Sequence, residues 1–378
     1  MKTLDRDLQK IIEKWLFKNK VITIYGPRQV GKTTLAKKLL NKYGNEQNYF
    51  NCDHINVRDS LQHLEPLSLK KIIGNAKIVV FDEAQKIENI GLILKILHDT
   101  YPELQIIATG SSSFDLANRI QEPLTGRGLE YILYPFSLHE LTQIYRRIDL
   151  NNQLEQLLLF GSYPEIVQAS SQTDARNLLD NLTNKYLYKD VLEFETIKHP
   201  NFIVKLLQLL AFQVGNEVSI HELANNLNIS RKTVERYLDI LEKAFVIFRL
   251  KAFSRNLRKE ITKKEKIYFY DLGIRNSLIA QYNPLNLRQD KGALWENFCI
   301  VERLKYLEYT EHHGNKYFWR THDQKEIDYV EDYDGILHGY EFKWDGKSYK
   351  IPKDFLTGYP GSSVTIIDRN NYLDFLCE

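Results

Sequence analysis

The feature that most constrains this chain is the run Gly-Pro-Arg-Gln-Val-Gly-Lys-Thr at positions 26–33, which fits the pattern G-x-x-x-x-G-K-[ST]. An apolar run at 21–25 precedes it and predicts a buried strand, and a helical pattern opens at Thr33. Glycines in such a turn let backbone N–H groups converge, and the helix that follows directs its positive N-terminus to the same point. The run therefore predicts a phosphate-binding loop between a strand and a helix.

The residue types in this loop suit the chemistry of ATP with Mg²⁺. The ammonium group of Lys32 would reach the β and γ phosphates, and the hydroxyl of Thr33 would bind Mg²⁺. Backbone N–H groups of the loop would meet the remaining phosphate oxygens. We expect ATP contacts from Gly26, Pro27, Arg28, Gln29, Val30, Gly31, Lys32, Thr33 and Thr34.

Two further apolar runs, at 77–81 and 104–109, predict strands that end in polar residues. Asp82 follows the first run and is placed to hold Mg²⁺ through water, while Glu83 beside it is suited to polarise the attacking water. The second run ends at Thr109-Gly110-Ser111-Ser112, where a polar side chain such as that of Ser111 could lie between the other two motifs and sense the γ phosphate. Serines after strands are also common turn formers, so both roles stay open for Ser111.

Arg127, in the run LTGRG, is a candidate arginine finger that would act on the nucleotide of a neighbouring subunit. That role implies a homo-oligomer. A lone arginine is also often a solvated surface charge or a helix partner, and this alternative stays open. Arg119 is a poorer candidate for the same role.

The chain divides into segments of different pattern. Strands that alternate with helices, after an amphipathic helix at 1–18, predict an α/β core at 1–135 with a parallel sheet covered on both faces. Residues 136–215 are patterned as helices throughout, and we interpret them as a helical extension of the core. A length of 378 residues suits two or three domains.

Residues 216–272 predict a winged helix-turn-helix. Ser219 with Glu222 forms a capping box at the first helix, Ser230 begins the second, and two strand-like runs follow. The stretch 251–266 holds seven basic residues against two acidic ones, which would supply salt-sensitive affinity for DNA. A lid or a subunit contact is the alternative role. Candidate DNA contacts are Ser230, Arg231, Lys232, Thr233, Arg236, Lys263 and Lys264.

The segment 273–378 carries a second group of charged residues. Asp328 lies in a strand-like run, a DYDG turn follows, and Glu341 and Lys343 lie in the next run, so the two runs predict a hairpin. Glu341 and Lys343 are two positions apart and would face the same side of their strand. An earlier acid, Glu296, lies on the preceding helix.

Over nearly its whole length the chain resembles a bacterial and archaeal family of AAA-like ATPases. The resemblance lies in GPRQVGKTT, DE-x-Q and TGSSS, in L-x-GR before Y-PFSLHEL, and in GSYPEIV and YLYKDVL. It implies a P-loop ATPase core, a winged-helix segment and a nuclease-like end domain. It implies no particular substrate.

The end domain is also similar, in motif and in order of elements, to the PD-(D/E)xK nucleases, whose fold is the α/β restriction-endonuclease fold. This resemblance implies that Asp328 and Glu341 hold Mg²⁺, that Lys343 activates water, and that Glu296 is an accessory metal ligand. The proline that often precedes the aspartate in those nucleases is absent, since Glu326-Ile327 stands there.

Composition limits the remaining classes. The 51 basic and 49 acidic residues nearly cancel, so any basic function is local. Three scattered cysteines fit neither a disulfide framework nor a zinc cluster, and no run of ~18 apolar residues predicts a membrane span, so we expect a cytoplasmic protein. Two hypotheses remain: an ATP-controlled, metal-dependent DNA-processing enzyme, or a nucleotide-dependent switch whose end domain only binds DNA or a protein.

Overall fold

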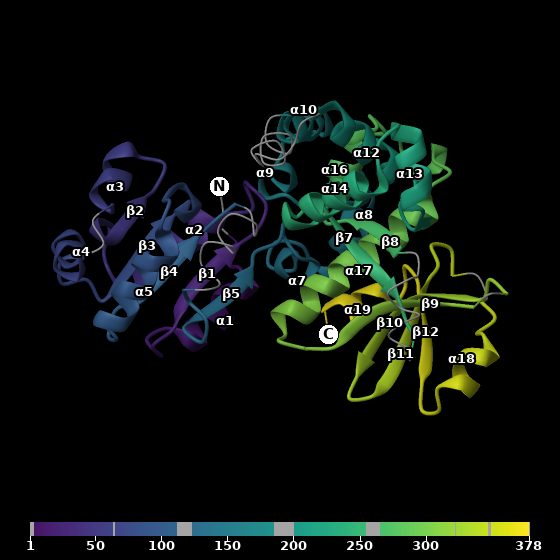
Figure 1. Ribbon diagram of the computed structural model, residues 1–378. Helices are drawn as coiled ribbons and strands as arrows, with labels where there is room; N and C mark the ends of the chain where they lie inside the picture. The colour runs from purple at the N-terminus through teal and green to yellow at the C-terminus, as the bar shows by residue number, and fades with distance from the viewer. Residues whose placement is uncertain are drawn as a thin grey trace. The chain divides into compact units, whose positions relative to one another are not determined.

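The computed structural model describes residues 4–62, 65–111, 123–184, 200–254, 265–321, 323–346 and 349–377. Its contacts divide the chain into two compact units, Met1–Pro135 with Lys243–Phe245, and Phe136–Glu242 with Val246–Glu378 (Figure 1). Within the described ranges, no helix combines the length and the apolar character needed to cross a membrane.

The first unit is built on a five-stranded sheet with the order β2-β3-β4-β1-β5, in which every pair is parallel (Figure 1). All residues of β1, β3 and β4 are buried, and since side chains alternate between faces, both faces of the sheet are covered. The predicted parallel α/β sheet is thereby confirmed. The strands are β1 (Val21–Tyr25), β2 (Tyr49–Asn51), β3 (Ile78–Asp82), β4 (Gln105–Thr109) and β5 (Gly128–Ile132).

The helices of this unit follow the predicted alternation with strands. They are α1 (Asp7–Trp15), α2 (Lys32–Tyr43), α3 (Ile55–Ser60), α4 (Pro66–Ile73) and α5 (Ile90–Thr100), with single 3₁₀ turns at Glu46–Asn48 and Ala84–Lys86. Helix α1 is shorter than the predicted 1–18, because the backbone is extended at Leu16 and left-handed at Phe17 (φ 59°). Its buried stripe is Leu8, Ile11 and Ile12.

The second unit begins with helices, as the pattern of 136–215 predicts. They are α7 (Leu138–Leu141), α8 (Arg147–Phe160), α9 (Pro164–Val167), α10 (Gln172–Leu182) and α12 (Pro200–Phe212). Helix α7 opens with a complete capping box: the Ser137 side chain accepts from the Glu140 N–H, and the Glu140 carboxylate accepts from the Ser137 N–H.

The segment predicted to be a winged helix contains β6 (Glu217–Val218), α13 (Ile220–Leu227), α14 (Arg231–Lys243), β7 (Ile247–Ala252) and β8 (Glu265–Phe269). The hydroxyl of Ser219 accepts a hydrogen bond from the Glu222 N–H at 3.3 Å, and that of Ser230 accepts from the Thr233 N–H at 3.1 Å. Helix α13 ends at Asn228, which is left-handed (φ 53°). Two helices joined by a short turn and followed by an antiparallel strand pair are therefore present.

One sheet of seven strands runs through the second unit in the order β12-β11-β10-β9-β7-β8-β6 (Figure 1). Strand β7 pairs in parallel with β9, so the strands before residue 272 and those after it share this sheet. The predicted boundary between 272 and 273 thus crosses a continuous sheet. Its later strands are β9 (Asn315–Arg320), β10 (Glu326–Tyr333), β11 (Ile336–Phe342) and β12 (Ser363–Ile367).

The hairpin predicted at DYDG is present, since β10 and β11 are antiparallel and Tyr333 pairs with Ile336. Its two loop residues, Asp334 (φ 50°) and Gly335 (φ 79°), are both left-handed, as in the type I′ turns that suit the twist of paired strands. Asp-Gly is a preferred sequence for this turn because both residues tolerate positive φ.

Helix α17 (Lys291–Tyr309) lies against this sheet, and the described part of the chain from residue 272 on holds four further helical segments. Trp295 of α17 is fully buried, and its ring contacts those of Phe298, Trp344 and Tyr372 at centroid distances of 5.9, 5.6 and 5.4 Å. The further segments are α16 (Leu272–Leu278), a 3₁₀ turn at Leu285–Leu287, α18 (Lys353–Gly358) and α19 (Tyr372–Cys377).

Replacing Trp295 with alanine should lower the free energy of unfolding of this unit by about 3–5 kcal/mol, because it removes a large buried side chain and leaves a cavity. Calorimetric unfolding with Leu287→Ala as control would measure it. Leu287 is 70% exposed, so its truncation should change stability by less than about 0.5 kcal/mol. A similar small change for Trp295→Ala would contradict the assigned core.

Candidate functional site

The loop at 26–33 adopts a backbone that only some residues tolerate. Gly26 has φ +144° and Gly31 has φ +98°, and Gln29 between them is also left-handed (φ 61°). A Cβ at Gly26 would lie 2.2 Å from the carbonyl oxygen of Leu133, so the strand-to-loop junction admits no side chain there. The loop joins the end of β1 directly to the first turn of α2.

Two cations brace this loop. The Lys32 ammonium donates to the carbonyl oxygens of Gly26 and Pro27, both at 2.8 Å, and the side chain is buried. The guanidinium of Arg6 donates to the carbonyls of Val30 and Tyr134, each at 2.6 Å. Arg6 had no signal in the sequence, because it precedes the loop by 20 residues and lies in an ordinary charged helical pattern.

Asp82, at the carboxyl end of β3, is the centre of the hydrogen bonds around the loop. Its Oδ2 accepts from the hydroxyls of Thr33 at 2.8 Å and Tyr49 at 2.5 Å, and its Oδ1 accepts from the hydroxyl of Thr109. The structure therefore brings together Thr33 and Asp82, the two residues expected to hold Mg²⁺ beside ATP. Tyr49 was missed, whereas Thr109 belongs to the stretch after the third strand from which a polar side chain was expected near the loop.

Glu83, Gln85 and Ser111 form a second chain of contacts beside Asp82. Glu83 is left-handed (φ 53°), and its N–H donates to the Thr109 hydroxyl at 3.1 Å. The amide of Gln85 donates to the Glu83 carboxylate at 2.5 Å and to the Ser111 hydroxyl at 3.1 Å. Such backbone strain in a non-glycine residue is typical of functional sites. Strand β4, which leads to Ser111, lies between β1 and β3.

Arg127 lies at the other end of the sheet. It directly precedes Gly128, which pairs with Val21 at the start of β1, whereas the loop follows the end of β1. Its guanidinium binds both oxygens of Asp99, at 2.7 and 3.1 Å. Hydrogen bonds from Arg127 and His98 hold the pKa of Asp99 down, at about 2. Arg127 therefore does not face the loop of its own chain, and Arg119 and Ser112 fall outside the described residues.

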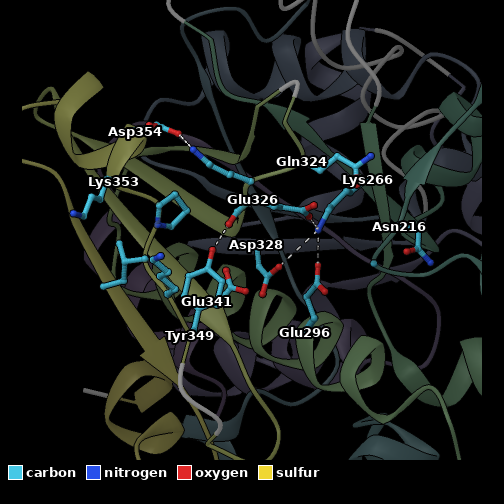
Figure 2. Close-up of a pocket in the computed structure, with 15 residues that line it drawn as sticks. Asn216, Lys266, Glu296, Gln324, Glu326, Asp328, Glu341, Tyr349, Lys353 and Asp354 are labelled. Atoms are coloured by element: carbon cyan, nitrogen blue, oxygen red, sulfur yellow. Dashed lines mark hydrogen bonds and ion pairs between the residues drawn. The ribbon is translucent and has the colours of Figure 1, made fainter.

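The predicted carboxylates of the end domain line one pocket of about 760 Å³ in the second unit (Figure 2). Glu296 comes from α17, Asp328 from β10 and Glu341 from β11. Three separate elements therefore each place one acid in the same cavity. Figure 2 shows Glu326 and Lys266 beside these acids, and neither was predicted as a site residue.

A β-bulge orients Asp328. The pairing of β10 with β9 shifts between Ile327 and Val330, where β10 has one more residue than its partner. Ile327 and Val330, three positions apart, consequently pack in the same hydrophobic cluster. The Asp328 side chain points into the pocket instead, and its Oδ2 accepts the Phe342 N–H at 3.0 Å.

The pocket contains a carboxylate oxygen without a partner. Lys343 donates to Oε1 of Glu341 at 2.5 Å, while Oε2 is buried and accepts no hydrogen bond. Burial, followed by the charge of Asp328, raises the pKa of Glu341 to about 7, and the same two causes raise the pKa of Glu296 to about 7. Both shifts show how costly it is to place several ionised acids in one buried site.

These donors suit a hard divalent cation in kind, because Mg²⁺ prefers carboxylate oxygens and Glu341 Oε2 is available to it. Across the described ranges, however, no three His, Cys, Asp or Glu side chains are arranged so that they could hold a metal ion. Lys266 contacts both Glu296 and Asp328, so an ammonium group takes part of the space among the predicted ligands.

The predicted DNA contacts are described in part. Arg231, Lys232 and Arg236 are exposed on α14, whereas Ser230 and Thr233 bond to each other at the start of that helix. Lys263 and Lys264 lie outside the described residues.

A phosphate loop after the first strand of a parallel sheet is the arrangement of a P-loop nucleotide-binding domain. A family model described as "AAA domain" matches residues 18–142. Two domains of unknown function, DUF8612 and DUF4143, match residues 151–290 and 291–367. Their junction coincides with the start of α17.

Relatives with similar sequences are known only as uncharacterized proteins. The chain is 28% identical over 341 residues to the uncharacterized protein Rv2008c of Mycobacterium tuberculosis, covering 89% of this chain and 73% of the relative. It is 29% identical over 322 residues to MJ1544 of Methanocaldococcus jannaschii, covering 80% and 69%. Among solved structures, Drosophila ORC bound to AT-rich DNA and Cdc6 matches at 10% identity over 74% of this chain and 91% of the other, with a TM-score of 0.26.

Gly26→Ala should abolish nucleotide binding, because the new Cβ would meet the Leu133 carbonyl at 2.2 Å and the loop would have to move. Equilibrium binding of a fluorescent ATP analogue would measure the loss. The matched control is Gly126→Ala, whose position also has positive φ (+76°) but has no atom within 4 Å of the added Cβ. Equal affinity of both variants for the ATP analogue would contradict the close packing of Gly26 against the Leu133 carbonyl.

Proposed function

We propose that this chain is a Mg²⁺-dependent ATPase whose nucleotide state controls a C-terminal domain that binds or cleaves DNA. The observation that carries the ATPase part is the hydrogen bond between Thr33 and Asp82, which joins the phosphate loop to the end of β3. In P-loop ATPases a loop hydroxyl and a strand-end aspartate together hold Mg²⁺. The match of residues 18–142 to a AAA domain supports the same reading.

Each residue near the loop has a role in this proposal. Lys32 exchanges its carbonyl partners for the β and γ phosphates, and Glu83 accepts a proton from the attacking water. Gln85 orients the Glu83 carboxylate and links it to Ser111, so that the γ-phosphate position and the base are coupled. Thr33 and Asp82 would hold Mg²⁺, which would supply positive charge to neutralise the phosphates.

Arg127 acts in this scheme only between subunits, since it lies at the far end of the sheet from its own loop. Its bidentate pair with Asp99 then has to open in a homo-oligomer before the guanidinium reaches a neighbour's nucleotide. The pair is exposed, so exchange of one partner for another costs little.

Lys32→Ala should lose ATP binding, whereas Glu83→Gln should bind ATP and lose turnover by a factor on the order of 10²–10⁴, because it removes only the proton acceptor. Phosphate release and nucleotide affinity, measured on the same preparations, separate the two effects. Lys42→Ala, at the exposed end of the same helix, is the control and should match wild type. Unchanged turnover in Lys32→Ala would remove the loop from the proposal.

For the second unit, the pocket supports chemistry at a phosphodiester. Asp328 and Glu341 would hold Mg²⁺, with Glu296 as an accessory ligand, and Lys343 is in place beside Glu341 to orient water. Bound Mg²⁺ would supply charge stabilisation at the phosphate. Arg231, Lys232 and Arg236 on α14, together with Lys263 and Lys264, would contact the DNA backbone or groove.

A second candidate is a nucleotide-dependent switch whose pocket binds without cleaving. The observation that favours it is the ion pairing of Lys266 with Glu296 and Glu326, which commits acids of the pocket to a protein cation. A pocket of this kind would bind DNA or a protein partner in response to the state of ATP.

Incubation of linear and circular DNA with Mg²⁺ or Mn²⁺, with and without ATP, distinguishes the two candidates. Glu341→Gln should reduce cleavage by about 100-fold or more, because it removes a charged metal ligand. Asp332→Asn, on the neighbouring strand β10, lies outside the pocket and should cleave like wild type. Absence of cleavage by wild type, with ATP turnover intact, would support the switch.

A further inference from the structure

Lys266 is a buried lysine in a pocket of acids. Its side chain is 2% exposed, although lysine is among the residues least often fully buried. The ammonium lies 3.0 Å from Glu296, 2.5 Å from Glu326 and 4.0 Å from Asp328 (Figure 2). Three carboxylates this close to the buried ammonium balance its charge inside the fold.

The pocket divides its acids between two lysines. Lys343 pairs with Glu341 on one side, and Lys266 pairs with Glu296 and Glu326 on the other. Four carboxylates therefore face two ammonium groups, and Asp328 lies between them with one oxygen bound to the Phe342 N–H. The buried Glu341 Oε2 has no hydrogen-bond partner, which leaves room for a cation on that side.

The backbone keeps Lys266 in place. Lys266 lies on β8, where it pairs with Leu250 of β7 on one side and with Glu217 of β6 on the other. Tyr268, two residues further along the same strand, donates to Glu296 at 2.6 Å from the same face. Because β8 is paired on both sides, the backbone position of Lys266 is fixed within the sheet. Lys266 belongs to the segment predicted to be a winged helix.

We propose that Lys266 is a built-in cation that fills one cation position of the acidic pocket, so that wild type leaves space for a single divalent ion beside Asp328 and Glu341. The proposal rests on the metal-binding role of this pocket under the proposed function. It also makes the pocket a composite site, to which the segment before residue 272 contributes the second positive charge.

Lys305 provides a matched comparison within the same unit. It is equally buried, at 1% exposure, and pairs with Glu302 at 2.6 Å. Its remaining partners are the Phe136 carbonyl and the Ser162 hydroxyl, and it does not line the acidic pocket. Removal of either lysine leaves a buried carboxylate without its cationic partner. Of the two sites, only that of Lys266 has several carboxylates and lines a pocket that ions can enter.

The test is metal rescue of stability in the full chain, stripped with EDTA and without nucleotide. Lys266→Met should lower Tm by about 5–15 °C, because breaking a buried ion pair is strongly destabilising. Millimolar Mn²⁺ should restore roughly half of that loss or more, since the ion binds only the folded state. Lys305→Met should lose Tm to a similar degree and gain no more from Mn²⁺ than wild type does.

The proposal would be overturned if Lys266→Met lowered Tm and Mn²⁺ raised the Tm of this variant no more than that of wild type. An unchanged Tm in Lys266→Met without metal would overturn it as well. If this variant folds under no condition, Lys266→Met combined with Glu296→Gln removes charge of both signs and is measured instead. That double variant should bind Mn²⁺ at least about tenfold more tightly than wild type, because the competing ammonium is gone. Equal affinity would overturn the proposal.

The same titrations separate this proposal from the nuclease. A second bound Mn²⁺ that Lys266→Met shows and wild type lacks would support the built-in cation, whether or not the single ion of wild type takes part in DNA cleavage. Mn²⁺ binding by wild type that Asp328→Asn abolishes and Lys266→Met leaves unchanged would overturn the built-in cation alone.

Discussion

Both candidate sites depend on one constraint, which is that a charge removed from water has to find partners inside the fold. Asp82, 3% exposed, finds three hydroxyls, from a helix start and two other strands. Lys266, 2% exposed, finds carboxylates from α17 and β10. In each case the partners come from elements far apart in the chain, so the buried charge and the packing that surrounds it stabilise each other.

The two units position their charges differently. In the first, parallel strands end at the same edge of the sheet, and β4 between β1 and β3 brings Thr109 beside Asp82. In the second, the charges lie along strands of a mixed sheet, and a bulge in β10 points Asp328 into the pocket beneath α17. An edge site of the first kind is open to a large ligand such as a nucleotide, whereas the second is a lined cavity.

Much of the secondary structure followed from local pattern. The strand expected at 21–25 has those bounds, and the DYDG hairpin forms because Asp334 and Gly335 accept positive φ. The missed features depend on distant contacts. Helix α19 packs against α17, and β7 pairs with β9 across the expected boundary at 272. Neither contact changes the local sequence pattern from which helices and strands are predicted.

By itself the sequence determined the phosphate loop and the identity of the clustered acids, because loop geometry depends on eight consecutive residues and strand faces on a period of two. It also predicted that Glu296, Asp328 and Glu341 would act together, and they line one pocket. Only the tertiary structure decided that Tyr49, Thr109 and Lys266 join these groups. A lysine in a basic run has the same local pattern whether water or three carboxylates surround it, and the pairing of distant strands determines which of the two it meets.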